Sequence, residues 1–369
     1  MERISKHQLA AMIILFQIGS TPLFEIGIRT GQNAWIVVIC NMLLGCLLLL
    51  MFLAIHRKEP DKNLNELFIH YFGTVAGKAL ALFYVLLFIY ESMRNLRDFG
   101  DLTVLTILPR TPISLIMLVM VALSVYALKK GIEIFFRLAE FIVAGVLFFY
   151  LILIAMTFVS GLVHWKRLLP VMENGVRPIL LESSESLWFP FGQMMIFLIF
   201  WKYAADKAGV SKASLRAYFT AGFVILITSV INISVLGHQF TDISTVPLLQ
   251  TVQLIQIADV FERFDTLVIM LFYAGIYMKA TLWLLAAVLG LSQIFPVGYR
   301  TFLLPVGGVI YATAFLPPSW QAHLEFGETV ATRFMMNPIF LGIIPAVLYA
   351  VMLLKIRFPP RRRYANPRP

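Results

Sequence analysis

Long runs of apolar residues alternate with short polar segments along almost the whole chain. A helix needs about 20 mostly apolar residues to cross a lipid bilayer. Ten windows meet this requirement, at residues 8–28, 33–55, 76–97, 112–128, 132–159, 178–203, 213–237, 266–293, 301–316 and 335–356. The pattern therefore predicts an all-α integral membrane protein with about ten transmembrane helices.

Two further segments are partly apolar but do not fit a span. Residues 64–72 are short and mixed in polarity, which predicts an interfacial helix. Residues 243–262 are amphipathic, and we do not expect them to cross the membrane.

The composition agrees with a membrane protein. Apolar and aromatic residues make up 60% of the 369 residues and charged residues 14%, whereas soluble domains average about 45–50% and about 25%. The mean hydropathy is +0.84. These values exclude an ordinary soluble enzyme, a disordered chain and a secreted disulfide scaffold.

Positive charge is distributed unevenly around the windows. The net charge of +10 comes partly from a basic tail at residues 358–369. Such a tail is typical of a chain that meets anionic lipid, so we expect the lipid bilayer and no nucleic acid as its partner. If the N-terminus is cytoplasmic, the inside segments and their flanks hold twenty Lys and Arg residues and the outside segments nine. This asymmetry predicts that both termini are cytoplasmic.

A polar connection at residues 161–177 divides the ten windows into two groups of five. Because five is odd, the second group must enter the membrane from the opposite side, which is the geometry of an inverted repeat. We therefore expect a five-helix repeat at 1–160, an extracytoplasmic connection at 161–177, a second five-helix repeat at 178–357 and a cytoplasmic tail at 358–369.

The first window contains residues that break helices. Gly19, Ser20 and Thr21 precede Pro22. Serine and threonine are N-cap residues, and proline fits the first turn of a new helix. A helix that starts in mid-membrane has unpaired N–H groups and a positive dipole end, and both favour a bound carboxylate.

The sixth window, which is the first of the second half, is also interrupted. Pro190 has no N–H, so the carbonyl of Ser186 is expected to lose its helical partner, and Gly192 permits a close approach of the chain. Free carbonyls favour an ammonium group or a cation. Together the broken helices 1 and 6 predict a site for a zwitterion such as an amino acid. The alternative is two structural proline kinks, which membrane helices tolerate.

Ionisable and aromatic residues inside the windows are further candidates. A charge at the bilayer centre costs roughly 2.5–3.5 kcal/mol, so such residues usually face the protein interior. Lys279 and Glu91 are candidates for an ion, proton or coupling role; the alternative for Lys279 is an interhelical ion pair, and that for Glu91 is snorkelling or a pair with Arg94. Tyr90, Tyr277 and Thr281 are candidate ligand contacts, with helix packing as the alternative.

The remaining polar residues form no recognisable catalytic or metal site. Glu25, Glu182 and Glu185 lie toward the outer ends of their windows, where we expect a solvated vestibule. The six histidines are scattered without metal-ligand pairing. No phosphate loop, nucleotide fingerprint or GxSxG elbow occurs. We therefore expect no enzyme activity, no cofactor and no metal.

Three sequence blocks stand out as motifs. They are RISKHQLAAMIILFQIGST at the start, LRDFGDLTVLTILPRTP at 96–112 and GIEIFFRLAEF at 131–141. In these blocks, in length and in number of windows, the chain resembles the B-subunit family of spore germinant receptors. That family belongs to the amino acid–polyamine–organocation transporter superfamily.

The resemblance implies a receptor in the inner membrane of a bacterial spore that senses a small germinant, commonly an amino acid, with A and C subunits as partners. It also implies the five-plus-five inverted repeat. In that superfamily the first break holds the ligand carboxylate, which corresponds here to Gly19, Ser20 and Thr21. The sixth-span break holds the amino group and side chain, and it corresponds to Leu187, Trp188, Phe189, Phe191 and Gly192.

Three functions remain open from the sequence. The first is a receptor whose conformational change is detected by a partner, the second is a secondary amino-acid transporter, and the third is a structural subunit of a channel complex. Receptor and transporter need the same pocket, so the pocket does not separate them. Some proton-coupled relatives carry a lysine in span five, and none lies between Arg137 and Trp165. This difference and the family resemblance favour the receptor.

Overall fold

A computed structural model describes residues 3–255 and 265–357 of the chain. These residues form helices and turns but no β-strand, and an isolated bridge pairs Ile4 with Ala204. The all-α prediction is confirmed. The predicted basic tail at 358–369 and the last part of segment 243–262 lie outside the described residues.

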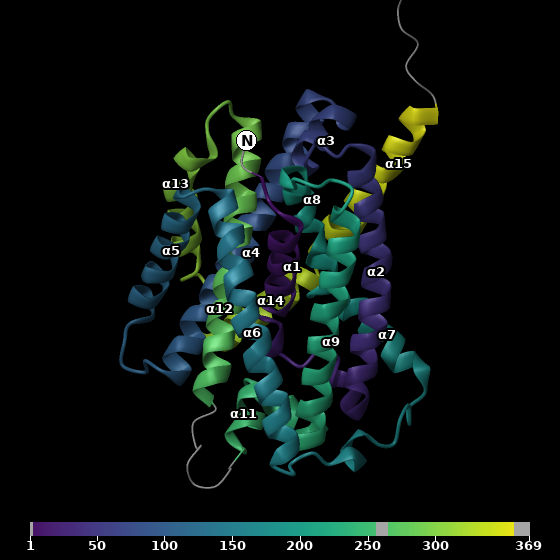
Figure 1. Ribbon diagram of the computed structural model, residues 1–369, viewed down its shortest axis with the longest axis vertical. Helices are drawn as coiled ribbons and strands as arrows, with labels where there is room; N and C mark the ends of the chain where they lie inside the picture. The colour runs from purple at the N-terminus through teal and green to yellow at the C-terminus, as the bar shows by residue number, and fades with distance from the viewer. Residues whose placement is uncertain (1–2, 256–264, 358–369) are drawn as a thin grey trace, which may run out of the picture.

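The helices that correspond to the predicted windows form one upright bundle (Figure 1). In chain order they are α1 Lys6–Ile18, α2 Ala34–Lys58, α4 Thr74–Thr106, α5 Ile113–Lys129, α6 Ile132–Val159, α7 Val176–Ser186 with η4 Phe191–Ile196 and α8 Phe197–Phe200, α9 Val210–Leu236, α12 Asp265–Ile294, α13 Tyr299–Thr313, and η6 Pro338–Ile343 with α15 Ile344–Arg357. The connecting helices are η1 Thr21–Leu23, η2 Ile28–Asn33, α3 Leu64–Phe72, η3 Trp165–Leu168, η5 Trp201–Tyr203, α10 His238–Ile243, α11 Pro247–Gln253 and α14 Trp320–Thr332.

Polar residues fix the starts of α1 and α3. Ser5 Oγ accepts a hydrogen bond from the Gln8 N–H at 3.1 Å, and Gln8 Oε1 accepts one from the Ser5 N–H at 2.9 Å. Asn63 and Glu66 make the same reciprocal pair. Such capping boxes satisfy N–H groups that the first helical turn leaves unpaired. Helix α3 occupies the range predicted for an interfacial helix.

Helix α12 forms the centre of the bundle. In its most apolar stretch 72% of the residues are buried, compared with 22% in α6. Helix α12 packs against α4, α13 and α1. A helix that is apolar on all sides must be covered either by protein or by lipid. Helix α12 is covered mainly by protein, whereas α6 leaves most of its apolar stretch for lipid.

Six helical segments in the described chain are long and apolar enough to cross a membrane, and α5 is a shorter apolar helix. The protein is therefore a multi-pass membrane protein. Helix α1 ends at Ile18, ten residues before its predicted window ends, and α13 has only 15 residues. The count of ten spans and the division into two five-helix repeats stay predictions.

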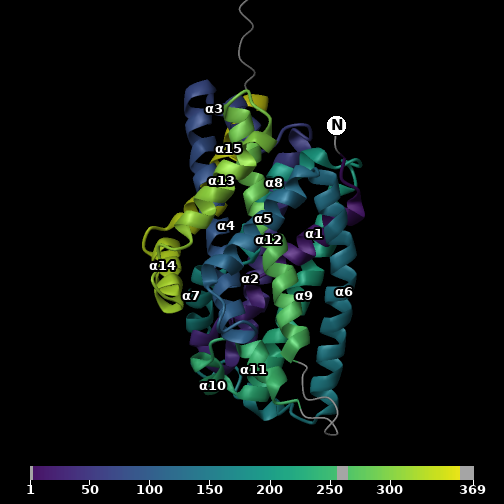
Figure 2. The same cartoon turned by 90° about the vertical axis from the view of Figure 1, so that its left-hand side faces the viewer.

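The start of α1 and the end of α15 lie at the same end of the bundle, which we call the terminal end (Figure 1). Helices α10 and α11 lie toward the opposite end (Figure 2). Helix α14 projects from one side at middle height in the same view. Since α1 starts at the terminal end and is only about 20 Å long, its last residue lies inside the bundle.

Candidate functional site

The first break lies where α1 ends inside the bundle. After Ile18 the chain continues as the single 3-10 turn η1, not as the new α-helix that the sequence predicted. The Thr21 hydroxyl donates a hydrogen bond to the Gln17 carbonyl at 2.6 Å, which holds this turn against the end of α1. The backbone N–H groups of Ser20 and Thr21 have no partner among the described residues. Two donors are thus available at the break.

The second break separates α7 from η4. The Phe189 N–H donates a hydrogen bond to the Ser186 carbonyl at 3.2 Å, so that carbonyl is not left free by Pro190 as the sequence predicted. The Pro190 carbonyl instead accepts a hydrogen bond from Gln17 Nε2 at 3.2 Å. This contact joins the two breaks directly.

A cavity of about 250 Å³ lies where both breaks meet α4 and α14, and we call it the charged cavity. Its lining is Ser20, Phe24, Glu91, Arg94, Asn95, Asp98, Phe189, Gln193, Leu324, Gly327, Glu328, Ala331 and Asn337.

The charged cavity contains groups of both signs. Gln193 Nε2 donates a hydrogen bond to Glu91 Oε2 at 3.1 Å. Asp98 Oδ1 lies 2.9 Å from Nε2 of the fully buried His323, which ties α4 to α14. Arg94 makes no ion pair within 4.0 Å to a carboxylate of the described chain. A guanidinium in this state can donate two parallel hydrogen bonds to a ligand carboxylate.

Lys279 does not line the charged cavity but contacts Phe189, which does. Its side chain is fully buried, and its ammonium has no hydrogen-bond partner in the part of the chain that is described. The Nζ atom lies 4.4 Å from the ring centre of Phe189 and 5.3 Å from that of Phe16. Cation–π contacts of this kind offset only part of the cost of burying a charge. Phe189 also lines the cavity, so its ring contacts both the cavity and the ammonium.

Gly327 of α14 makes room for Arg94. A Cβ atom at this position would overlap the Arg94 guanidinium. We expect Gly327→Ala to displace Arg94 and to weaken binding of a labelled amino acid about tenfold, because one charge-assisted hydrogen bond is lost. Titration of the purified protein measures this. Gly145→Ala is the control, because its Cβ would meet nothing within 4 Å. If Gly327→Ala binds the amino acid with unchanged affinity, Arg94 does not contact the ligand.

The residues predicted around the second break have different surroundings. Phe189 lines the charged cavity. Phe191 is fully buried against a tyrosine ring of α9, with the ring centres 5.5 Å apart. Trp188 packs over Gly192, where a Cβ would lie 3.2 Å from the indole. Leu187 is half-buried. The structure therefore brings Phe189 to the cavity, while the other four form the walls of the break.

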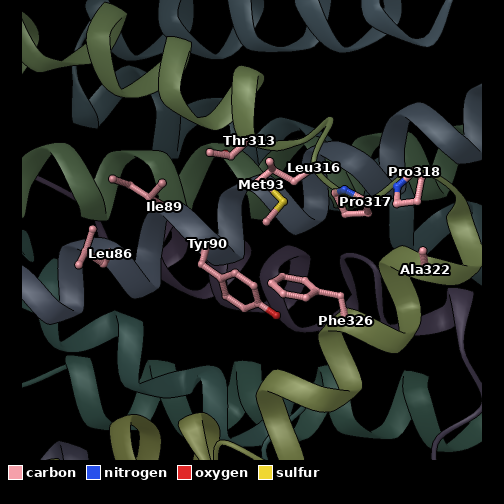
Figure 3. A pocket seen from close by; sticks show the side chains of 10 residues that line it. All are labelled: Leu86, Ile89, Tyr90, Met93, Thr313, Leu316, Pro317, Pro318, Ala322 and Phe326. Atoms are coloured by element: carbon pink, nitrogen blue, oxygen red, sulfur yellow. The ribbon is translucent and has the colours of Figure 1, made fainter.

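Tyr90 lines a different pocket. This apolar pocket of about 460 Å³ lies between α4, α13 and α14 (Figure 3). The Tyr90 ring faces Phe326 across it, with the ring centres 6.0 Å apart. Tyr90 precedes Glu91 and lies one turn before Arg94 on α4, but its ring lines this apolar pocket. The structure therefore does not bring Tyr90 to the charged cavity.

Tyr277 and Thr281 also lie away from the charged cavity. The Tyr277 hydroxyl donates a hydrogen bond to the Leu123 carbonyl at 3.3 Å. The hydroxyls of Thr281 and Ser124 are 2.8 Å apart. Both contacts fasten α12 to α5, so helix packing accounts for these two residues.

The glutamates predicted for a vestibule differ from one another. Glu25 accepts hydrogen bonds from Ser229 and from Asn232, the latter at 2.8 Å, so it is held by α9 rather than solvated. Glu185 is half exposed and pairs with Arg29 at 2.9 Å. Exposed pairs of this type contribute only about 0–1 kcal/mol to stability. The vestibule prediction thus suits Glu185 but not Glu25.

Residues 3–322 match the sequence profile of the family described as Spore germination protein. The chain belongs to this family. It is 30% identical over 356 residues to Spore germination protein KB of Bacillus subtilis (strain 168), covering 96% of this chain and 95% of that protein. Spore germination protein YndE of the same strain is 23% identical over 306 residues, 82% of each chain. The family resemblance drawn from the motifs is confirmed.

The fold is similar to that of solved transporters. The structure of Mhp1, a nucleobase-cation-symport-1 family transporter in a closed conformation with bromovinylhydantoin bound, matches with a TM-score of 0.68 at 14% identity, over 96% of this chain and 80% of Mhp1. A mutant of the Eremococcus coleocola manganese transporter matches with a TM-score of 0.50 at 14% identity, over 95% of this chain and 76% of that one. This spore germination family member therefore has a transporter-type fold, as predicted. The names of these proteins describe spore germination proteins and transporters, not enzymes.

Several residues of the charged cavity in this family member were not singled out from the sequence. Arg94, Asn95 and Asp98 follow Glu91 at spacings of three, four and seven residues, which places all four on one helix face. That spacing was the available signal, and the predicted window ended at residue 97 although α4 continues to Thr106. The contribution of α14 had no comparable signal.

Proposed function

We propose that the protein is the membrane subunit of a nutrient germinant receptor. It binds a small germinant, such as an amino acid, in the charged cavity and triggers spore germination with A and C subunits. It acts in the inner membrane of the spore with both termini cytoplasmic. The observation that carries this proposal is that two helix breaks and charged groups of both signs meet in one cavity of a spore germination protein.

The charge pattern supports a zwitterionic ligand. The Arg94 guanidinium and the free N–H group of Ser20, both at the cavity, are donors for a carboxylate, whereas Thr21 lines a separate small pocket. The carboxylates of Glu91 and Asp98 are acceptors for an ammonium group. Buried charges are stabilised only when they are paired and hydrogen-bonded. A ligand with both charges pairs these groups at once.

A secondary amino-acid transporter is the second candidate, and the transporter-type fold supports it. Lys279 and Glu91 would then have the coupling role, because a buried ammonium can substitute for a coupling cation or release a proton. A receptor uses the same cavity, but it requires only that the ligand binds one conformation more tightly than the other.

The ammonium contact is testable with two ligands. Glu91→Gln keeps an oxygen for the Gln193 amide but removes the charge. We expect an amino acid to bind about 30-fold more weakly, while its analogue without the amino group is unaffected, since a hydrogen bond to a charged group contributes about 2 kcal/mol. Calorimetric titration of the purified protein measures both. Glu140→Gln on the exposed face of α6 is the matched control. If the binding of both ligands is weakened equally, Glu91 supports the structure of the cavity and does not contact the ammonium group.

A further inference from the structure

Helices α5 and α13 lie side by side at the edge of the bundle (Figures 1 and 2). A groove of about 390 Å³ lies between them, away from the charged cavity, and we call it the α5–α13 groove. Its walls are mostly apolar and include Leu118, Val121, Val125, Leu304 and Tyr311. No part of the proposed germinant site contributes to it.

The groove opens away from the protein. Leu118 is 49% exposed and Leu304 63% exposed. At Gly308, which also lines the groove, an added Cβ would meet nothing within 4 Å. Apolar surface that is open at the edge of a multi-pass membrane protein faces lipid chains, because the bilayer replaces water there.

One end of the groove is basic. Lys129 lines this end and Lys130 follows it, both exposed and neither in an ion pair with a described carboxylate. The Lys130 ammonium lies 5.0 Å from the Tyr126 ring centre, beside the groove. The nearest carboxylate in sequence, Glu133, is paired with Arg137 at 2.7 Å. Two cations therefore remain available for an anion at this end.

The groove has the length of one lipid leaflet. Leu118 and Lys129 are eleven residues apart on α5, which corresponds to about 16 Å of helix. Half of the hydrocarbon core of a bilayer is about 15 Å thick. The lysines stand at the terminal end of the bundle, where the end of α5 meets the start of α13 through a hydrogen bond of 3.4 Å from the Tyr299 hydroxyl to the Leu128 carbonyl. The apolar part of the groove extends from there toward the bilayer centre.

We propose that the α5–α13 groove binds one anionic phospholipid from the leaflet at the terminal end. An acyl chain lies along the groove, and the phosphate contacts Lys129 and Lys130. Anionic headgroups are attracted to basic residues at the membrane surface. The unpaired lysines distinguish this lipid from a neutral one, and the hollow between α5 and α13 distinguishes the groove from an ordinary lipid-facing helix surface.

Native mass spectrometry of the purified full chain tests this proposal with phosphatidylglycerol and with phosphatidylcholine of the same acyl chains. We expect one phosphatidylglycerol to be retained at least about tenfold better than phosphatidylcholine. The double variant K129Q/K130Q should lose this preference and bind both lipids alike. Lys78→Gln, an exposed lysine at the start of α4, is the control and should keep it.

A second variant tests the binding of the lipid acyl chain separately. Gly308→Leu adds a side chain to the groove at a position where a Cβ would meet nothing within 4 Å, and it should weaken the binding of both lipids equally. Retention of phosphatidylglycerol by either Gly308→Leu or K129Q/K130Q at the wild-type level would overturn the proposal. A photo-crosslinking residue at Leu304 in native membranes should give an adduct with phospholipid mass. A crosslink to a protein instead would show that a transmembrane partner covers the groove, and would also overturn it.

Discussion

Lys279→Met is expected to raise the thermal stability of the protein and at the same time to abolish its response to the germinant. The lysine ammonium is fully buried without a hydrogen-bond partner among the described residues. Taking one charge out of water costs several kcal/mol, and an apolar side chain of similar size avoids this cost. Methionine fills the space but supplies no positive charge next to Phe189. Stability then rises while function is lost, which is the signature of a destabilising functional residue.

Two measurements on the same preparations check this prediction. The apparent melting temperature in detergent should rise for Lys279→Met, and binding of the labelled germinant should disappear. Lys78→Met, at an exposed lysine, should change neither quantity. A lower melting temperature with normal binding would mean that Lys279 is paired in the native protein and serves the structure alone.

Gly275→Ala is expected to damage the first break from the opposite side. A Cβ at Gly275 would lie 2.9 Å from both the Cα and the carbonyl oxygen of Gly19, and these backbone atoms cannot rotate away. Helix α12 must therefore move off the end of α1. Overpacking of this kind costs about 1–3 kcal/mol. We expect ligand affinity to fall at least about tenfold, because Lys279 lies one turn further along α12 and moves with it.

Gly19→Leu tests the same contact from the side of the break. A Cβ there would lie 2.7 Å from Cδ of Lys279 and 3.0 Å from the Phe16 carbonyl oxygen. The flexible lysine can yield, so the protein should remain folded while the ligand response is lost. Circular dichroism and binding are measured together, with Gly145→Ala as the control in open space. If both Gly275→Ala and Gly19→Leu respond normally to the ligand, the first break is not part of the ligand-binding site.

The apolar pattern predicted the peripheral helices better than the central ones. The window 132–159 coincides with α6, because Gly131 and Ser160 end an uninterrupted apolar run. The window 76–97 ends at the charged Arg97, too early on α4, which continues to Thr106. The Arg97 guanidinium instead pairs with Asp101 at 2.5 Å and donates hydrogen bonds to the carbonyls of Ala314 and Pro317, between α13 and α14. A hydropathy window cannot recognise a charge that the protein itself satisfies.

The candidate site was predictable only in part for a related reason. Glycine and proline showed where the first and sixth windows break, since their effect on the backbone is local. The α-helix expected after Gly19 does not form, and Glu25 in that segment bonds to α9 instead. Gly327 and His323 approach α4 from more than 200 residues away. Such long-range contacts decide which polar residues share a cavity, and a single sequence does not reveal them.

The most direct test of the account uses the purified protein in liposomes. A panel of labelled amino acids is assayed for saturable binding and for accumulation over time, under imposed sodium and proton gradients. We predict saturable binding that reaches a plateau at about one ligand per protein without accumulation inside the vesicles, and that Glu91→Gln weakens it. Accumulation that continues beyond this stoichiometry would contradict the receptor and establish a transporter. If no amino acid binds, or if Glu91→Gln leaves the binding unchanged, the charged cavity is not the germinant site.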